Sequence, residues 1–361
     1  MALDRITLST FRNHVETRLE DTRAINLLVG ENGAGKTNVL EALSLLAPGR
    51  GLRRAALADM AAQSANGGFA VSAALDTGDG GEAVKLGTGM QADRPGRRIV
   101  QVNGAEASAI SLAEWLAIGW LTPAMDRLFA ESAGVRRRYM DRLAVAIDPA
   151  HARYASRYEA ALRERNKLLS DERSPDPAWL DSIEAQMAAA GSQLGQGRAR
   201  LIGALSQELF ALPTQPFARP ALTHVPGGAL EEEALVDQLA SNRRRDRSAQ
   251  RTLNGPHRDE LQVVMDGKAM PAAECSTGEQ KAMLIAITLA HAGLAARGRP
   301  SLLLLDEVAA HLDPVRREAL FERLRTSGTQ VWLTGTEPGP FAGIISEAAS
   351  WRVADGAVER F

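Results

Sequence analysis

The chain has 361 residues, 45% of them apolar and 24% charged, and its formal net charge is −2. These proportions are typical of a globular protein, and the length suffices for two domains. The near-neutral balance excludes an overall basic field, so nucleic-acid binding would need a local basic patch. The single cysteine, Cys275, excludes an intramolecular disulfide and a cysteine-only metal site. No apolar stretch approaches the ~20 residues of a membrane span, and the N-terminus is too short and polar for a signal peptide. We therefore expect a cytoplasmic protein without membrane contact.

The first elements expected along the chain are two strands, a glycine-rich loop and a helix. Residues 3–11 are rich in β-branched and apolar residues, and residues 24–29 form the short apolar run of a buried strand. Residues 37–47 place apolar side chains at helical spacing, and Pro48-Gly49 follows them. The loop between strand and helix is the octet Gly30-Glu31-Asn32-Gly33-Ala34-Gly35-Lys36-Thr37.

This octet fits the phosphate-binding pattern of Gly, four residues, then Gly-Lys-Ser/Thr. Its glycines allow successive backbone N–H groups to turn inward around an anion, and the helix start adds its dipole. In that role Lys36 would reach the β- and γ-phosphates of ATP, and the Thr37 hydroxyl would bind Mg²⁺. The alternative is a glycine-rich turn that only caps a helix. The strand before the octet and the helix after it favour nucleotide binding.

The middle of the chain changes from strand to helix character. Short strands and glycine-rich turns over residues 69–102 predict an antiparallel meander. Residues 125–212 show helical spacing, and the polar break at 171–179 predicts a helical hairpin too short for a long coiled-coil arm. A looser stretch at 213–228 precedes one further helix over residues 228–247.

Strand character returns in the last third. We expect a strand at residues 261–265 with a turn at Asp266-Gly267, and then a long apolar helix to about Ala292. Two further strands are expected at residues 302–305 and 330–333, and a hairpin is expected around Asp355-Gly356.

Two carboxylates follow the apolar strand at residues 302–305. Asp306 is placed to hold Mg²⁺, directly or through water, and Glu307 to orient and polarise an attacking water. The alternative is a buried strand that simply ends at a polar loop. The presence of the phosphate loop favours the catalytic interpretation.

Ser276 and Glu279 precede the long apolar helix at the spacing of a capping box, which alone would explain both residues. The same geometry makes an anion site, because a serine hydroxyl and glycine N–H groups at a helix N-terminus attract phosphate. In one ATPase class such a site binds the γ-phosphate held by a second subunit. The two roles are compatible.

Arginines cluster at four places, which favours contacts to nucleic-acid phosphates over base stacking, since aromatic residues are only 4% of the chain. Each group alone is more often a solvated face. The groups are Arg50, Arg53 and Arg54; Arg94, Arg97 and Arg98; Arg136, Arg137 and Arg138; and Arg243, Arg244, Arg245 and Arg247.

The order of these motifs resembles the ATP-binding-cassette ATPases: phosphate loop, helical insertion, residues 276–280 (STGEQ), residues 302–307 (LLLLDE), residues 311–313 (HLD) and residues 334–336 (TGT). Within that class the chain is similar to the SMC-like repair ATPases of the bacterial RecF family. That closer similarity rests on further stretches that are not general ATPase motifs. These are residues 162–168 (LRERNKL) and residues 255–259 (GPHRD), and the match also includes Phe11-Arg12-Asn13.

The resemblance implies an α/β fold: an ABC-type ATPase head, with a mixed sheet around the phosphate-loop core and an antiparallel β subdomain, and an inserted α-helical lobe. We place the N-terminal part of the head at residues 1–124, the insertion at 125–250 and the C-terminal part of the head at 251–361.

The resemblance also implies roles for residues. Gly30, Glu31, Asn32, Gly33, Ala34, Gly35, Lys36 and Thr37 would bind ATP, Thr37 and Asp306 would bind Mg²⁺, and Lys36, Asp306 and Glu307 would carry catalysis. Ser276 and Gly278 would form a signature loop that acts across a dimer, Asp313 would be the dimer-facing aspartate, and Thr336 would be the switch residue. Cys275, Thr277 and Glu279 depart from the usual cassette signature, and Ala124 stands where RecF proteins often have an acidic residue.

The implied activity is ATP-dependent DNA binding in recombinational repair and replication, as part of the response to DNA damage. The protein would dimerise on ATP, hold duplex DNA near single-strand gaps, help to load recombinase with RecO and RecR, and release DNA on weak, DNA-dependent hydrolysis. Arg53 and Arg54 are our candidates for DNA contacts because they follow the nucleotide-binding helix. The alternatives are the ATPase subunit of a transporter and a phosphate-loop kinase of small molecules.

Overall fold

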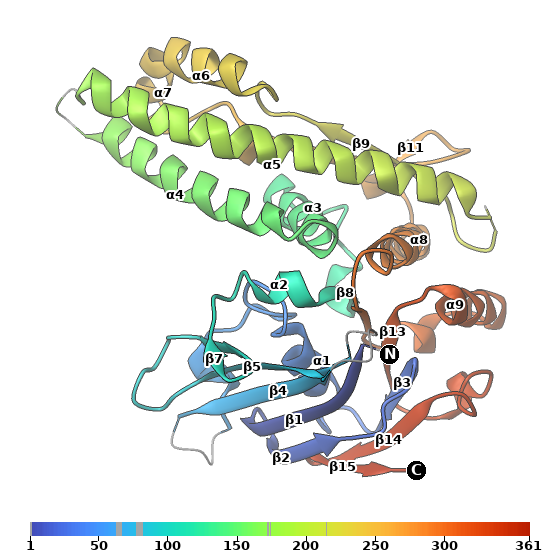
Figure 1. Ribbon diagram of the computed structural model, residues 1–361. Coiled ribbons are helices and arrows are strands. Elements are labelled where there is room, and N and C mark those ends of the chain that lie inside the picture. The colour runs from blue at the N-terminus through green and yellow to red at the C-terminus, as the bar shows by residue number, and fades with distance from the viewer. Residues whose placement is uncertain (1, 63–66, 77–81, 172, 174, 214) are drawn as a thin grey trace. The chain divides into compact units, whose positions relative to one another are not determined.

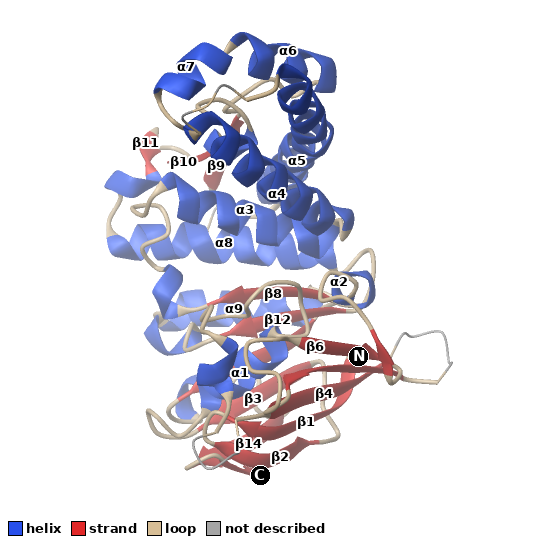
Figure 2. Cartoon of the chain, turned by 90° about the vertical axis from the view of Figure 1, so that its left-hand side faces the viewer, coloured by secondary structure: helices blue, strands red, loops and turns tan. Residues whose placement is uncertain are grey.

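The computed structural model describes the chain except for residues 1, 63–66, 77–81, 172, 174 and 214. The chain divides into two compact units. Unit 1 comprises residues 1–126, 213–217 and 284–361, and unit 2 comprises residues 127–212 and 218–283. Figures 1 and 2 show that strands dominate unit 1 and helices dominate unit 2.

Unit 1 contains the predicted meander as part of a larger antiparallel sheet. Strand β1 occupies the predicted residues, Leu3–Phe11, and pairs with β4 as well as with β2, a strand that the sequence interpretation missed. The strand order is β2 (His14–Leu19), β1, β4 (Phe69–Leu75), β5 (Val84–Met90), β6 (Ile99–Val102) and β7 (Ala105–Glu106).

The second sheet of unit 1 is mixed and carries the predicted nucleotide-binding strand at its centre. Neighbouring strands are parallel except for the C-terminal hairpin β14–β15, which is antiparallel and confirms the turn expected at Asp355-Gly356. The order is β15 (Ala357–Arg360), β14 (Ala349–Ala354), β3 (Ile25–Val29), β13 (Gln330–Gly335), β12 (Ser301–Leu305) and β8 (Ala117–Leu121).

Helix α1 (Lys36–Ser44) packs its apolar side into the core that the two sheets share. Val39, Leu40 and Leu43 are fully buried in that core. The helix ends three residues before the expected end at Ala47. Trp332 and Trp351 stack in the same core with ring centroids 5.6 Å apart. Unit 1 also contains the helices α2 (Leu112–Trp115) and α9 (Pro314–Thr326).

Unit 2 is built on the predicted helical hairpin, α4 (Ala150–Ser170) and α5 (Pro177–Ala211), whose helices lie side by side (Figures 1 and 2). Helix α5 has 35 residues, about 50 Å, and takes in residues 177–179 of the expected break, because Asp176 caps it and Pro177 suits a first helical turn. Helix α3 (Ala133–Ile147) precedes the hairpin.

The expected single helix over residues 228–247 is wrong in its bounds and continuity. The chain forms α6 (Glu232–Ser241) and α7 (Arg243–Ser248), separated at Asn242. The guanidinium group of Arg243 pairs with Glu184 and Asp181 of α5, which fixes the start of the second helix.

Strand β9 (Pro220–Val225) lies within the stretch expected to be loose, and pairs with the expected strand β10 (Glu260–Met265), whose other partner is β11 (Met270–Pro271). Because β10 pairs with a strand of the insertion, unit 2 continues to Met283, whereas we had placed the end of the insertion at residue 250. Helix α8 (Thr277–Ala295) begins in unit 2 and ends in unit 1.

Candidate nucleotide-binding site

The glycine-rich octet joins the end of β3 to the start of α1, as the sequence pattern predicts (Figure 1). Gly33 and Gly35 have φ angles of 85° and 118°, in the region that favours glycine. A Cβ atom on Gly35 would lie 2.8 Å from side-chain atoms of Asn13 and His14. Glycine is therefore required at position 35 by both backbone conformation and space.

Lys36 is held over this loop. Its side chain is 4% exposed, and its ammonium group donates to the carbonyl oxygens of Gly30 (2.7 Å) and Glu31 (2.9 Å). The carboxylate of Glu307 lies 3.8 Å from the same nitrogen. Burial lowers the pKa of Lys36 below its ordinary value, and the charges of Glu307 and Asp306 oppose that shift. The result is a buried cation at the mouth of an anion-binding loop.

Asp306 accepts hydrogen bonds from residues at the edge of the sheet where the neighbouring parallel strands have their carboxyl ends. The Thr37 hydroxyl donates to Asp306 Oδ1 at 2.9 Å, and the Thr334 hydroxyl donates to the same oxygen at 2.9 Å. Thr334 also accepts a hydrogen bond from the backbone N–H of Glu307 (2.9 Å), which has a φ of 52°. The two residues expected to bind Mg²⁺ are thus already in contact.

Thr334 is a residue that the sequence interpretation did not select. Our candidate at the end of β13 is Thr336, whose side chain is exposed, whereas that of Thr334 is buried. The register of the parallel sheet, which no local sequence signal shows, sets Leu333 opposite Leu305 and so brings Thr334 beside Asp306.

The Phe11-Arg12-Asn13-His14 segment supports the phosphate loop from outside. The Asn13 amide donates to the carbonyl of Ala34 (2.9 Å), and the His14 ring nitrogen Nε2 lies 3.1 Å from the carbonyl of Gly35. Burial lowers the pKa of His14, so the imidazole is neutral at physiological pH. Gly356, in the C-terminal hairpin, donates its N–H to Ala34 at 3.0 Å.

Arg53, a candidate for DNA contact, is bound to helix α1. Its guanidinium group pairs with the buried carboxylate of Glu41 (3.0 Å) and donates to the side-chain oxygen of Asn38 (2.6 Å). Arg12 also pairs with Glu41, at 2.8 Å. Arg54 is exposed, with a φ of 58°.

A cavity of about 540 Å³ lies beside the phosphate loop. It is lined by Arg12, Asn13, Val15, Asn38, Asp59, Ala61 and Ala62. Asn38 donates to Asn13 at 2.7 Å across its wall. The cavity has room for a group attached to phosphates that the loop would bind.

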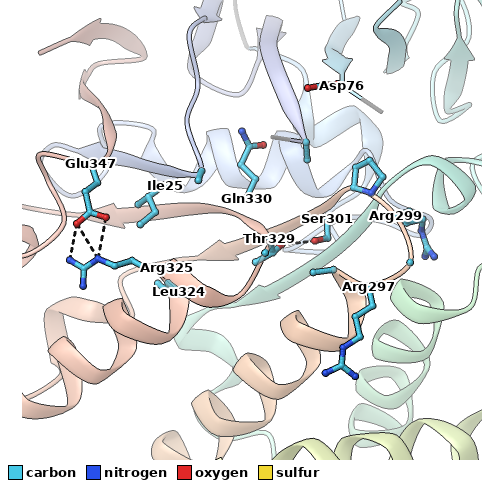
Figure 3. A pocket seen from close by; sticks show the side chains of 16 residues that line it. Ile25, Asp76, Arg297, Arg299, Ser301, Leu324, Arg325, Thr329, Gln330 and Glu347 are labelled. Carbon is cyan, nitrogen blue, oxygen red and sulfur yellow. Dashed lines mark hydrogen bonds and ion pairs between the residues drawn. The ribbon is translucent and has the colours of Figure 1, made fainter. Parts of the chain in front are cut away.

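A larger cavity, about 600 Å³, lies at the opposite edge of the mixed sheet (Figure 3). Its lining includes Ile25, Ser301 and Gln330, which are the first residues of β3, β12 and β13. The drawn ion pair joins Arg325 to Glu347, at 2.9 Å. Since ligands of such sheets bind at the carboxyl ends of the strands, this cavity is not the phosphate site.

The expected signature segment lies in unit 2. Ser276 and Glu279 form the capping box: the Ser276 hydroxyl and N–H each donate to Glu279 Oε2 at 2.9 Å. Lys268 pairs with Glu279 at 2.5 Å. A Cβ atom on Gly278 would meet nothing within 4 Å, so packing within the chain does not require glycine there.

Asp313 has a local structural role. Its carboxylate caps helix α9 by accepting from the N–H of Arg316 at 3.0 Å, and it lies 3.6 Å from the Arg316 side chain. About half of the carboxylate side chain is exposed, so it is free to face a second protein as well.

A magnesium ion would depend on the nucleotide. In the described ranges, no group of three or more His, Cys, Asp or Glu side chains could hold a metal ion. Thr37 and Asp306 offer two oxygen ligands, and phosphate oxygens would have to supply others. The same ranges contain no helix long and apolar enough to cross a membrane.

Comparisons with known proteins agree with this geometry. The family model for the RecF/RecN/SMC N-terminal domain matches residues 2–343. The protein named DNA replication and repair protein RecF in Mesorhizobium japonicum is 46% identical, over 99% of this chain and 97% of that protein. The chain belongs to the RecF family. The Brucella suis RecF is 45% identical, over 99% of this chain and 95% of its own length.

Solved structures show the same fold. The structure described as the recombination mediator protein RecF with ATP in the RecFOR pathway superimposes with a TM-score of 0.86 at 22% identity, over 100% of this chain and 97% of that one. An SMC head bound to the C-terminal winged-helix domain of ScpA gives a TM-score of 0.57 at 15% identity, over 100% and 97% of the two chains. This RecF-family chain therefore has the ABC-type ATPase head fold expected from its sequence.

Proposed function

We propose that the protein binds ATP and Mg²⁺ and uses them to control its hold on DNA in recombinational repair and replication. The observation that carries this proposal is the convergence of Lys36, Thr37, Asp306 and Glu307 at the carboxyl ends of β3 and β12. The RecF relatives, which match nearly the whole chain, supply the biological context.

The residues present fit a nucleotide. Within the described residues, the Lys36 ammonium group contacts two backbone carbonyl oxygens and the Glu307 carboxylate. When ATP binds, the ammonium group would exchange the carbonyl oxygens for oxygens of the β- and γ-phosphates. When bound, Mg²⁺ neutralises phosphate charge. Thr37 and Asp306 would hold it, while Thr334 keeps the Asp306 carboxylate in place. Glu307 would orient the attacking water, and the cavity beside Asn13 would receive the nucleoside.

The proposed site is completed by a second copy of the chain. Ser276 and Gly278 would bind the γ-phosphate of the partner, with Asp313 and Thr336 near the same dimer contact. Support comes from the exposed hydroxyl of Ser276 and the open space around Gly278. ATP would then hold the dimer together, and weak hydrolysis would release it.

The proposed partners are duplex DNA near single-strand gaps and the proteins RecO and RecR, with recombinase loading as the outcome. Arg53 and Arg54 are the proposed first DNA contacts. The structure of a RecF relative is described as part of the RecFOR pathway, which supports this choice of partners. The transporter and kinase alternatives have no such support, since the relatives align with nearly the whole chain.

The test uses Glu307→Gln, which should retain ATP by preventing its hydrolysis. Gel filtration of this variant should give a dimer with ATP and a monomer without it. Fluorescent duplex DNA should then bind more tightly with ATP than without it. Equal DNA affinity in the two conditions would refute the proposed control of DNA binding by ATP.

A further inference from the structure

Two arginine-rich segments that are distant in the sequence lie together in unit 1. The first arginine segment is residues 49–54 (GRGLRR), which follows helix α1, and the second is residues 93–98 (DRPGRR), between β5 and β6. Together they contain six arginines and a single acidic residue, Asp93. Neither contains an aromatic residue. They form a strongly basic pair of loops in a chain that is nearly neutral overall.

Arg98 joins the two segments. Its guanidinium group donates to the carbonyl oxygens of Gly49 (2.6 Å) and Ala47 (3.2 Å) and to that of Leu45. Its Nε donates to the Thr88 hydroxyl at 2.8 Å. A single side chain of the second segment therefore holds the chain that leaves helix α1 and enters the first segment.

The partners of Arg98 are carbonyl groups and a hydroxyl, not carboxylates. Burial lowers the pKa of its guanidinium group to about 10, which leaves it protonated at neutral pH. A cation at the C-terminal end of a helix is stabilised by the helix dipole, and here the helix is the one that carries Lys36 and Thr37. Arg98, which is half-buried, thus organises the loops through hydrogen bonds to their backbone.

The other arginines of the two segments do face solvent. Arg94 and Arg97 are 56% and 58% exposed, Arg53 is 42% exposed, and Arg50 is also exposed. The partner of Arg97 is Glu106, at 2.9 Å and 69% exposed, and that of Arg94 is Asp93, at 3.9 Å and 74% exposed. Exposed pairs of this kind stabilise little, so a phosphate can replace the carboxylate.

We propose that the two segments form one surface that binds the phosphate backbone of duplex DNA, with Arg94 and Arg97 as contacts and Arg98 as the residue that positions them. This inference rests on the proposed function and extends the DNA contact from Arg53 and Arg54 to a second loop. Arginine guanidinium groups bind phosphate oxygens in pairs, and the absence of aromatic residues from the segments disfavours a single strand held by base stacking.

The test compares two double variants. Arg94→Gln with Arg97→Gln should keep ATP affinity and weaken duplex binding at least about tenfold at ~0.1 M salt. The slope of log affinity against log salt should fall by about 1.8, since each lost phosphate contact removes about 0.9. The control is Arg5→Gln with Arg18→Gln, which removes two exposed arginines of unit 1 that are also paired with exposed glutamates.

Equal loss of affinity in the two double variants would overturn the proposal, because net charge alone would then explain the effect. The proposal would also be overturned if the Arg94/Arg97 double variant bound duplex DNA normally but no longer bound polyglutamate. The surface would then bind an acidic protein instead of DNA. Arg98→Met should also lower the salt slope, because the half-buried Arg98 side chain positions the two segments. Wild-type protein that binds DNA equally with and without ATP would instead refute the proposed function and leave this surface standing.

Discussion

The Thr37 hydroxyl donates a hydrogen bond to the Asp306 carboxylate at 2.9 Å, although 269 positions separate the two residues in the chain. The parallel pairing of β3, β13 and β12 brings them together, because it sets the carboxyl ends of the three strands at one edge. Thr334, near the end of the middle strand, donates a second hydrogen bond to the same carboxylate oxygen. The fold thus brings together the two residues that we propose as ligands of Mg²⁺.

Thr334→Val should therefore impair hydrolysis. The variant keeps the shape of the side chain but loses the hydrogen bonds to Asp306 and Glu307, and losses of about 10- to 100-fold in Mg²⁺-dependent ATP turnover are expected. Thr336→Val makes the same change at the exposed threonine that follows the strand. Steady-state hydrolysis over a Mg²⁺ titration distinguishes the two threonines. Loss at Thr336 with normal turnover at Thr334 would reverse our assignment.

Lys36→Met should abolish ATP binding and yet stabilise the protein without nucleotide. The phosphates lose their main point charge, so affinity measured by titration calorimetry should fall at least about a hundredfold. The pKa of Lys36 is lowered by burial, so the unfolded chain binds its proton more tightly and stability rises with pH as the lysine loses its charge. Removing the cation should raise Tm at neutral pH by about 2 °C. A lower Tm would show that Lys36 supports the empty loop.

Ser276→Arg separates capping from phosphate binding. Monomer ATP affinity should remain near that of the wild type, whereas dimerisation and hydrolysis should be lost. Glu279→Ala serves as the control, since it breaks the capping box and leaves the Ser276 hydroxyl in place. That control should retain hydrolysis, and any loss of stability should be small because Glu279 lies at the surface. Full activity of Ser276→Arg would refute the proposed phosphate contact and leave helix capping as the role of Ser276.

Arg198→Met should destabilise unit 2 in a pH-dependent way. Arg198 lies between Asp141 and Asp259, with hydrogen bonds of 2.8 Å to both carboxylates. Burial raises the pKa of Asp141, but the hydrogen bond from His151 and the charge of Arg198 lower it to about 2; the pKa of Asp259 is also lowered. Their contribution to stability is present above about pH 4 and is lost as the pH falls toward 2.

Without the cation both carboxylates lose their guanidinium partner and keep only hydrogen bonds such as those to His151 and His224, so the free energy of unfolding should fall by about 3–5 kcal/mol at pH 7. Acidification to pH 5 should restore part of it in the variant and leave the wild type unchanged, as urea titrations would show. Arg163→Met, which removes an exposed arginine of α4, should cost less than about 0.5 kcal/mol. A variant whose stability loss is the same at both pH values would contradict this account.

The elements that could be predicted from the sequence are those that carry a local pattern of residue types. Strand β1, the phosphate loop, the apolar strand before Asp306 and the final hairpin each carry a local pattern. Strand β2 was missed because only one of its faces is buried and its sequence, HVETRL, is largely polar. Strand β9 depends on β10, which lies some 40 positions later in the chain; such pairings have no local signal.

Side-chain partnerships were the least accessible to sequence analysis. Arg165 lies in a stretch that marked the family resemblance, but nothing local indicates that it is completely buried between Glu184 and Asp246. The sequence shows that Arg53 follows the nucleotide-binding helix. Its pairing with Glu41 depends on how the chain turns after α1, which the sequence does not show. Residue types and spacing predict which chemistry is present, whereas partner choice needs the fold.

The proposed nucleotide site can form only after the hairpin β14–β15 has been synthesised, because the hairpin contacts the phosphate loop. A Cβ atom on Gly30 would lie 2.1 Å from the carbonyl oxygen of Val353, and Gly356 donates to Ala34 of the phosphate loop. Strand β14 also pairs directly with β3. During synthesis the loop at residues 30–37 leaves the ribosome more than 300 residues before these partners do. Nascent chains should therefore be unable to retain ATP until residues 349–356 have emerged.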